Sequence, residues 1–441
     1  MKNLGLFLLV MIVICSACKT SSENVVVSEP EERNELLVFY EEGTKNILDN
    51  FQIQYPEYDL KVKKFYGEEE SLKDLILYNG EPDIILLNYK LNSDYDRMLE
   101  EKYGYDLSGF VKEDVNIEND QYFPGTFSVC KNNDELVALP LGIGLQMIIM
   151  REEVWLDTEF AALDNNYTAQ DLLEAIEVEL DRKWETGVVF NPEQVGISYQ
   201  MLQTLGAIEG TGEKVTINEE IYAQLYEIWY KGKQYLEDLD ATGYNGQFEM
   251  TFVRPLAGAP QISLASSTSY NKFVYDQDIH VLYFPCISDT SGYGASVQTA
   301  GLVGKNSNSK QQAYEFLKLL MDTPIETYIL NDDLFETTFC PVNKENAQIF
   351  LEKFEEVAKS QGGIPFGSWG EEQEIIELTK VSEIEREKLY QVIDNIQYLY
   401  RKTDTGEKVD EIIRRYQDMN SKSYKESYLE VLNMLNERVE G

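Results

Sequence analysis

Few residues in this sequence have the types and spacing that catalysis or metal binding requires. The 441 residues include one histidine, His280, so histidine-rich zinc sites and nucleophiles paired with histidine have little to build on. His280 lies in the apolar run 279–282 and is interpreted as a strand residue rather than a ligand. The segment 142–144, Gly-Ile-Gly, lacks the third glycine of a dinucleotide-binding loop. We therefore expect no enzyme, no cofactor and no metal site.

Acidic residues are too abundant to single out a catalytic pair. The chain has 78 Asp and Glu against 38 Lys and Arg, which gives a net charge of −40. A carboxylate pair for glycoside hydrolysis would fit among them, so a secreted glycan-active hydrolase stays open as an alternative. Residues 164–166, Asp-Asn-Asn, lack the glycine and terminal glutamate of a calcium loop. Because phosphate backbones need clustered positive charge, the composition argues against nucleic-acid binding.

Aromatic residues point to a different chemistry, the binding of a small polar ligand. The 29 Tyr and four Trp supply flat rings that can stack on sugar faces while their polar tips form hydrogen bonds. Trp155, Trp184 and Trp229 are interpreted as structural, because they lie in or beside helical stripes. Trp369 lies in the glycine-flanked loop 367–370 and either stacks on a ligand or fills the end of a core.

The N-terminal segment predicts secretion and lipid attachment. Residues 1–18 combine an early lysine with an apolar run that is too short for a stable membrane span. Its end, Cys15-Ser-Ala-Cys18, resembles a bacterial lipobox, so Cys18 is expected to carry lipid as the new N-terminus. Residues 19–34 are polar and predict a flexible tether. The further cysteines, Cys130, Cys286 and Cys340, lie far apart in the sequence and show no disulfide framework. Free thiols are expected at Cys286 and Cys340, with a disulfide between these two as the alternative.

The stretch 136–151 is the centre of the predicted organisation. An apolar run ends at Pro140, and a second apolar run starts at Met147 after two glycines. Since proline lacks a backbone donor, we expect two strands rather than one, joined by a bendable crossing between two cores. A single hairpin inside one domain is the alternative. The chain length fits roughly two domains of 100–200 residues each.

Hydrophobic periodicity predicts an α/β chain. The first part alternates strands and helices, which favours a parallel sheet covered by helices. A capping box is expected where Thr168 and Asp171 start a helix. The tail from Glu371 is predicted to be helical, with packing stripes at 389–396 and 428–435. The strands expected elsewhere are 36–40, 59–65, 83–87, 261–265, 279–284 and 299–303, and the helices 47–55, 72–76, 201–205, 221–235 and 310–321.

This order of elements resembles the bacterial extracellular solute-binding lipoproteins of ABC importers, of the sugar-binding family 1 type. The segment 106–110, Asp-Leu-Ser-Gly-Phe, is similar to the Asp-Leu-[Ser/Thr]-x-aromatic segment of that family. Residues 133–140 resemble its approach to the hinge, with Ala138 in place of the usual glycine. The order of Pro285, the glycine-containing strand 299–303 and a helix after Ser309 is also similar.

The resemblance implies a two-lobed periplasmic-binding-protein-like fold of type II, in which each lobe is a mixed sheet flanked by helices. Lobe 1 would comprise 35–140 and 287–338, and lobe 2 would comprise 141–286 and 339–441, joined by hinge crossings. It implies a monomer, lipid-anchored on the extracellular face of the cytoplasmic membrane. Such a protein captures a small polar ligand, with a mono- or oligosaccharide favoured, and delivers it to the permease subunits of an importer. A surface interaction lipoprotein without a small ligand is a further alternative.

The predicted ligand-binding residues follow from the position of strand ends. Open α/β sheets bind ligands outside the carboxyl ends of their strands. In the resembled fold those ends border the cleft between the lobes. The residues predicted there are Glu42, Gly43, Asn88, Tyr89, Tyr199, Gln200, Ser267, Tyr270, Tyr293 and Trp369.

Overall fold

The computed structural model describes most of the chain from residue 34 to residue 437. The described residues are 34–41, 44–66, 69–89, 101–115, 117, 119–132, 134–151, 155–163, 167–182, 196–209, 215–241, 254–255, 279–287, 292–322, 340–349, 364–366, 374–376, 383–401, 403–419 and 423–437. Within them, no helix is both long and apolar enough to cross a membrane.

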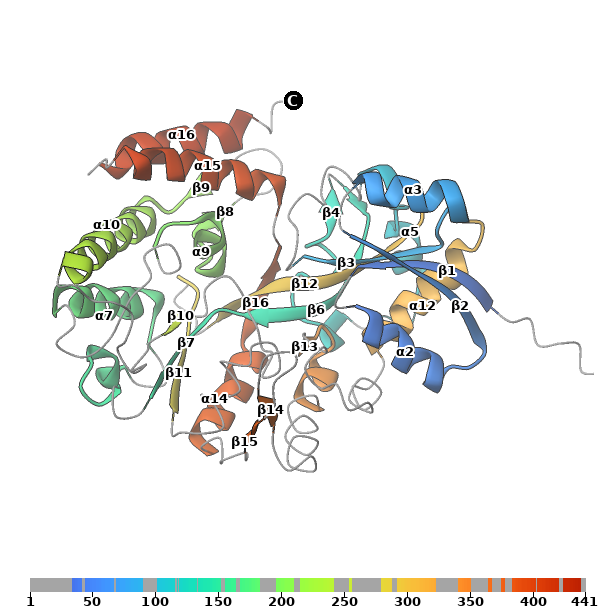
Figure 1. The fold of residues 1–441 in the computed structure, drawn as a ribbon, viewed down its shortest axis with the longest axis horizontal. Coiled ribbons are helices and arrows are strands. Elements are labelled where there is room, and N and C mark those ends of the chain that lie inside the picture. Colours follow the sequence, from blue (N-terminus) through green and yellow to red (C-terminus); the bar gives the residue numbers. More distant parts are fainter. Residues whose placement is uncertain are drawn as a thin grey trace, which may run out of the picture.

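A mixed sheet, with seven strands among the described residues, forms the centre of one side of the molecule (Figure 1). The strand order is β13-β6-β12-β3-β1-β2, with β16 beside β12. The first three strands confirm the predicted parallel arrangement, because β1 runs parallel to both β2 and β3. By contrast, β12 runs antiparallel to β3 and β6. The bounds are β1 (Asn34–Glu41), β2 (Tyr58–Phe65), β3 (Ile84–Asn88), β6 (Leu139–Leu145), β12 (Tyr293–Val303), β13 (Cys340–Pro341) and β16 (Ile396–Tyr400).

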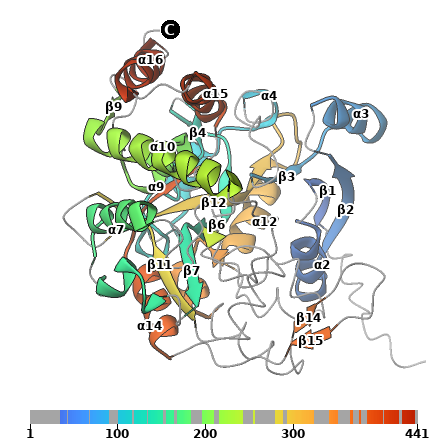
Figure 2. The ribbon, with the colours of Figure 1, turned by 60° about the vertical axis from the view of Figure 1, so that its left-hand side comes forward.

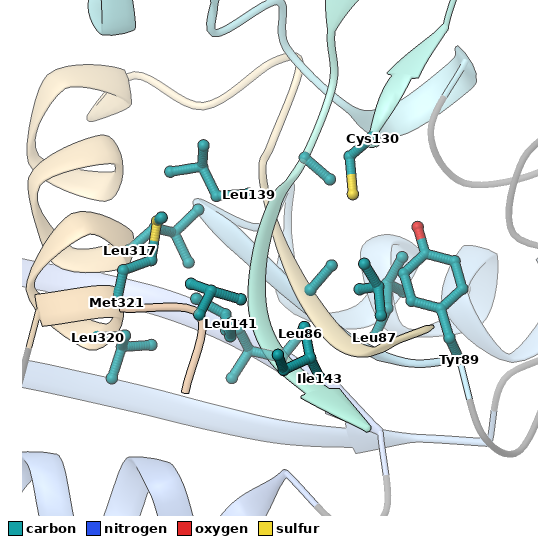
Figure 3. Close-up of a cluster of buried hydrophobic side chains, with 14 of the residues drawn as sticks. Leu86, Leu87, Tyr89, Cys130, Leu139, Leu141, Ile143, Leu317, Leu320 and Met321 are labelled. Carbon is teal, nitrogen blue, oxygen red and sulfur yellow. The ribbon is translucent and has the colours of Figure 1, made fainter. Parts of the chain in front are cut away.

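Helices cover this sheet and bury its apolar side chains. All five residues of β3 are buried, which explains its nearly unbroken apolar sequence. The predicted apolar face of α12 (Lys310–Asp322) is buried as well, and Figure 3 shows Leu317 and Met321 of this helix beside Leu139 of β6. Further helices on this side are α2 (Lys45–Gln54), α3 (Glu69–Asn79), α4 (Glu101–Tyr103), α5 (Ser108–Glu113) and the 3₁₀ turn η2 (Asn119–Gln121).

The other side of the molecule holds a smaller sheet with its own helices. The described part of this sheet is antiparallel, in the order β10 (Arg254–Pro255), β7 (Met147–Arg151), β11 (Ile279–Tyr283). The predicted capping box opens α7, since the Thr168 N–H donates to Asp171 Oδ2 at 2.8 Å and the Asp171 N–H donates to Thr168 Oγ1 at 3.2 Å. The helices here are α7 (Ala169–Arg182), α9 (Tyr199–Thr204), α10 (Glu219–Ala241), α15 (Asp404–Asp418) and α16 (Tyr424–Glu437), with η3 (Glu159–Ala162).

Two separate hydrophobic clusters divide the molecule into two lobes. The first cluster surrounds the seven-stranded sheet and reaches one face of the small sheet through Val281 and Tyr283 of β11. The second lies between the small sheet, through Ile148 and Leu282, and the helices α7, α9, α10, α15 and α16. The two views agree, because α2 and α3 lie on one side of β12 and α7 and α10 on the other (Figures 1 and 2). The border crosses the chain between Met147, in the first cluster, and Ile148, in the second. The two-lobed α/β fold is therefore confirmed.

The strand break predicted at Pro140 is wrong. Strand β6 runs through Pro140, and the chain leaves it only at Gln146, before β7 starts. Pro140 fits into β6 because it lacks a backbone N–H at a point where the hydrogen bonds between β6 and its neighbouring strands are incomplete. Strand β13 pairs only with Gly142 and Ile143, and the pairing with β12 is irregular beside Pro140. The predicted crossing between two cores exists, at Gln146, directly before the second apolar run that starts at Met147.

The tail also departs from the helical prediction. Helix α14 (Glu383–Asp394) ends before Ile396, which starts strand β16. Pairing with β12 overrides the helical spacing of the apolar residues there. The short hairpin β14 (Ile364–Phe366) and β15 (Glu374–Ile376) overlaps the start of this tail. The small hairpins β4 (Lys131–Asn132) with β5 (Glu135–Leu136), and β8 (Ile208–Glu209) with β9 (Thr216–Ile217), complete the described elements.

The two hydrophobic clusters can be compared with the predicted division of the chain into lobes. The predicted division assigns 339–441 to lobe 2, whereas buried residues within 340–347 and 389–399 pack in the first cluster. Of that C-terminal region, the buried residues of α15 and α16 belong to the second cluster. The chain therefore returns to the first sheet through β13, α14 and β16 before it enters the second lobe for the last time.

The side chains that could have suggested chemistry have structural roles. Cys130, Cys286 and Cys340 are buried free thiols, as expected for Cys286 and Cys340. His280 lies in β11, where its ring stacks on Trp155 with centroids 4.8 Å apart. Trp155 and Trp229 are buried in the second cluster, which confirms their predicted roles, and Trp184 lies outside the described residues.

Candidate ligand-binding site

Polar side chains gather at one edge of the first sheet. The parallel strands β1 and β3 end there, at Glu41 and Asn88. Because β12 is antiparallel to β3, it places Thr299 directly opposite Asn88. The Tyr89 N–H then donates to Gln298 O at 2.8 Å, which brings the next residue of β12 to the same edge. This is the edge at which open α/β sheets bind ligands.

Glu41 fixes the geometry of this edge. Its side chain is buried, with 3% of the residue exposed, and its Oε2 accepts a hydrogen bond from the Asn88 N–H at 2.9 Å. A buried carboxylate is costly unless such hydrogen bonds compensate it, and bonds to charged groups are the stronger kind. Glu41 therefore ties the carboxyl end of β1 to that of β3.

Three buried oxygen atoms at this edge and at the adjacent crossing have no hydrogen-bond partner within the protein. They are Gln146 Oε1, Gln298 Oε1 and Thr299 Oγ1. Gln146 lies between β6 and β7, where the chain passes from the first cluster to the second. Buried polar atoms in folded proteins are usually satisfied, so three unpaired ones in neighbouring elements are informative. The fourth such atom among the described residues, Gln224 Oε1, lies on α10.

Helix α9 brings the second lobe to this region. Its Thr204 Oγ1 lies 2.6 Å from the Tyr400 hydroxyl of β16, and the Tyr398 hydroxyl donates to Thr204 O at 2.8 Å and also to Gln203 O. Burial raises the pKa of Tyr398 and of Tyr400 above the ordinary value of a tyrosine, and it raises the pKa of Cys286, which bonds Tyr398, to about 11. These groups are therefore neutral near pH 7, and α9 contacts β16 through uncharged hydrogen bonds.

The structure places Asn88 at the edge and Tyr89 in the core behind it. The Tyr89 ring is buried in the first cluster, and the Arg401 guanidinium lies 5.9 Å from its centroid. Figure 3 shows the Tyr89 hydroxyl pointing toward Cys130 among apolar side chains. Tyr89 thus joins the edge through its backbone, while its ring packs against the sheet.

Tyr199 and Gln200 lie at the start of α9, in the second lobe. The Tyr199 N–H donates to Asp410 Oδ1 at 2.7 Å, and its ring packs so closely on Gly406 of α15 that a Cβ there would come within 2.5 Å of it. Gln200 offers its carbonyl oxygen to Thr204 Oγ1 at 2.9 Å. The structure thus ties both residues to partners within the second lobe.

Tyr293 starts β12, where it is buried in the first cluster with its ring edge-on to Tyr283 at 6.4 Å. The remaining predicted site residues lie outside the described residues: Glu42, Gly43, Ser267, Tyr270, Trp369 and the anchor Cys18.

Sequence reasoning missed Gln146, Gln298 and Thr299. A detectable signal was present, because each glutamine interrupts an apolar strand sequence, Gly-Leu-Gln-Met-Ile and Ser-Val-Gln-Thr-Ala. Polar residues at such buried positions need a partner. In the described part of the chain, no group of three or more His, Cys, Asp or Glu could hold a metal ion.

The two hydrophobic clusters, each with its own sheet and helices, define the fold of the two-lobed periplasmic binding proteins. Solved structures with this fold cover 92% of the chain. One is an ABC substrate-binding protein from Listeria monocytogenes in complex with cycloalternan, with a TM-score of 0.53 and 12% identity over 99% of that chain. Another is the galacto-N-biose-/lacto-N-biose I-binding protein of Bifidobacterium longum in complex with lacto-N-biose, with a TM-score of 0.54 and 14% identity over 97% of that chain.

A third similar structure is the ABC transporter associated binding protein from B. animalis subsp. lactis in complex with β-1,6-galactobiose. Its TM-score is 0.52, at 17% identity over 98% of that chain. At these identities the likeness establishes the fold. A comparison of the sequence with protein-family models finds no match, and a search among curated proteins finds none.

Proposed function

We propose that this chain is an extracellular solute-binding protein that captures a mono- or oligosaccharide between its two lobes and delivers it to an ABC importer. The observation that carries the proposal is the set of buried, unpaired acceptors at the sheet edge and at the adjacent crossing, Gln298 Oε1, Thr299 Oγ1 and Gln146 Oε1. Sugar hydroxyl groups are hydrogen-bond donors that match such acceptors. Three solved structures of the same fold contain cycloalternan, lacto-N-biose and β-1,6-galactobiose, which supports the choice of ligand class.

Hinge bending between the lobes would close the protein on its ligand. The chain passes between the two clusters near Gln146, between β11 and β12, and between β16 and α15. In this proposal lobe 1 comprises the described residues of 34–147, 293–322 and 340–400, and lobe 2 comprises those of 148–287 and 404–437. A ligand that contacts both lobes favours the closed state by its difference in affinity for the two states. Binding, rather than chemistry, is then the activity of the chain.

A melting-temperature screen tests this function. The probes are cycloalternan, lacto-N-biose, β-1,6-galactobiose and mannotriose, with amino acids and polyamines as other ligand classes. A ligand bound by the folded state alone stabilises it by about 2.7 kcal/mol at one hundred times its Kd. We expect a sugar, and no member of the other classes, to raise the melting temperature. Release of new reducing ends would instead favour the hydrolase, and the absence of any shift would favour an interaction lipoprotein.

We further propose that lipid on Cys18 holds the protein at the outer face of the cytoplasmic membrane, where it meets permease subunits as a monomer. The motivating observation is the lipobox-like Cys15-Ser-Ala-Cys18 followed by a polar tether. Cys18→Ala should move the protein from the membrane fraction into the medium or leave it unprocessed. Ser22→Ala, in the tether, is the matched control and should leave the distribution as it is. Unchanged detergent partitioning of Cys18→Ala would contradict the anchor.

A further inference from the structure

Two helices of the first lobe end at the edge of the sheet opposite to the candidate site. Strands β1 and β2 start there, with Asn34 paired to Tyr58, and the Tyr58 N–H donates to Tyr55 O, directly after α2, at 3.1 Å. Helix α3 returns to the same edge, where the Asp83 N–H donates to Leu37 O at 2.8 Å. Figure 1 shows α3 and α2 on either side of β1 and β2. The last turns of both helices therefore lie at the edge where β1 begins.

These last turns expose large apolar side chains and carry no charge. Ile53 on α2 is 65% exposed, and Leu77 and Tyr78 on α3 are 76% and 81% exposed. The segments 50–56 and 75–80 contain no Asp, Glu, Lys or Arg, in a chain whose net charge is −40. A single exposed apolar residue needs no explanation, but three of them on two uncharged helix ends suit contact with an apolar partner. We call residues 50–56 and 75–80 the amino-end surface.

The N-terminal segment indicates which partner this surface meets. Residues 19–33 separate the expected lipid on Cys18 from Asn34, the first residue of β1. A tether of about 15 residues spans roughly 21 Å as a coil and at most about 54 Å when extended. The lipid thus holds the start of β1 closest to the bilayer. The chain itself brings a membrane to the amino-end surface, whereas another protein would have to reach it by diffusion.

We propose that the amino-end surface inserts Ile53, Leu77 and Tyr78 into the headgroup region of the membrane that carries the lipid anchor. Tyrosine suits this region because its ring is apolar and its hydroxyl can stay in water. The uncharged surroundings matter because an acidic surface is costly to take out of water and is repelled by anionic lipids. The inference rests on the proposed lipid anchor and does not depend on which sugar is bound.

The membrane contact orients the candidate site. Glu41 lies at the other end of β1 from Asn34, about 23 Å away at the rise of an extended strand. The edge that carries Asn88 and Thr299 then faces away from the bilayer, toward the medium from which a sugar arrives. Because binding strength follows the buried apolar area, a contact through three side chains is reversible. The protein can therefore leave it and turn on its tether to meet a permease.

Quenching of a fluorophore by spin-labelled lipid tests the contact. The full chain is purified from bacterial membranes and placed in phosphatidylcholine vesicles that contain a phosphatidylcholine with a nitroxide near its headgroup. Ile53→Cys provides the thiol for a nitrobenzoxadiazole label, since the other cysteines of the described chain are buried. We expect the emission to fall at least about twofold, because an inserted surface reaches about 5–10 Å into the headgroup boundary. The same label on Leu429→Cys, exposed on α16 in the second lobe, should keep its emission.

Two further substitutions distinguish insertion from closeness to the tether. Leu77→Glu and Tyr78→Glu, added together to the labelled Ile53→Cys variant, place two charges on the amino-end surface and should restore the emission. Leu429→Glu is the matched control and should leave the quenching as it is. Quenching that survives both glutamates would contradict the inference, because closeness to the tether alone would explain it. All four positions are exposed, and melting curves show that each variant is folded.

The outcomes also separate this inference from the proposed anchor. If the full chain does not float with the vesicles in a density gradient, the anchor fails and the inference fails with it. If the chain floats and the label on Ile53→Cys keeps its emission, the anchor stands and the inference is wrong. A doubled mass in sedimentation that both glutamates abolish would place a second copy of the chain on this surface, which would also overturn the inference.

Discussion

Phe316→Ala should lower the free energy of unfolding by about 3–5 kcal/mol, the usual cost of removing a buried aromatic ring. Phe316 is fully buried on α12, with its ring centroid 4.5 Å from that of Phe51 and 5.8 Å from that of Tyr58. The substitution therefore opens a cavity where α12 and α2 meet the strand β2. Denaturation in urea, followed by circular dichroism, measures the loss.

A matched control substitutes an exposed apolar residue by alanine, so that no buried packing is lost. Leu77 on α3 is 76% exposed, so Leu77→Ala should change the free energy of unfolding by no more than about 0.5 kcal/mol. A loss below about 1 kcal/mol in Phe316→Ala, far under the usual cost for a buried aromatic ring, would contradict the packing of α12 on the first sheet.

Glu41→Gln should weaken the binding of the sugar that raises the melting temperature most by about tenfold or more, which corresponds to about 1.4 kcal/mol. The Glu41 carboxylate holds the Asn88 N–H at 2.9 Å, and a hydrogen bond to a charged acceptor contributes about 1.5–3 kcal/mol. The amide keeps the size of the side chain but removes its charge and introduces donors. The edge that carries Asn88 and Thr299 should lose its fixed position. Titration calorimetry with the same sugar measures the change in Kd.

Glu35→Gln provides the control on the same strand. Glu35 is exposed and pairs with Lys61 at 2.5 Å, and such surface pairs contribute about 0–1 kcal/mol. Its substitution should leave Kd within a factor of about two, since it lies at the opposite end of β1. Equal Kd values for the wild type and Glu41→Gln would show that this edge does not bind the sugar.

Local patterns predicted the first lobe well because its early elements contact one another in chain order. The strands β1, β2 and β3 and the helices between them have clear hydrophobic periodicity. Their parallel pairing follows from the alternation of strands and helices along the chain. The prediction at Pro140 was wrong because the incomplete ladder beside it depends on β13, which comes from residues 340–341. The prediction at Ile396 was wrong because pairing with β12 determines the strand. Both depend on contacts between distant parts of the sequence.

The residues of the candidate site were likewise predicted where they depend on local sequence and missed where they depend on distant contacts. The rule for strand ends located Asn88, because the end of a buried strand is visible in the sequence. It did not locate Gln298 and Thr299, which reach the same edge only through the antiparallel register of β12 against β3. Gln146 was overlooked because the crossing was assigned to Pro140 rather than to the residue that leaves β6. The order of the residues along the chain does not by itself show the register of β12 against β3 or the end of β6.

Titration calorimetry of cycloalternan, lacto-N-biose, β-1,6-galactobiose and mannotriose into the unmodified chain tests sugar capture between the lobes most directly. A binding protein of this fold should take up at least one of them with saturable heat and one site per chain, and the sugar should be recovered unchanged. The same titration should lose affinity in Glu41→Gln and keep it in Glu35→Gln. The absence of saturable heat with all four sugars would contradict the proposed function, as would recovery of a cleaved sugar.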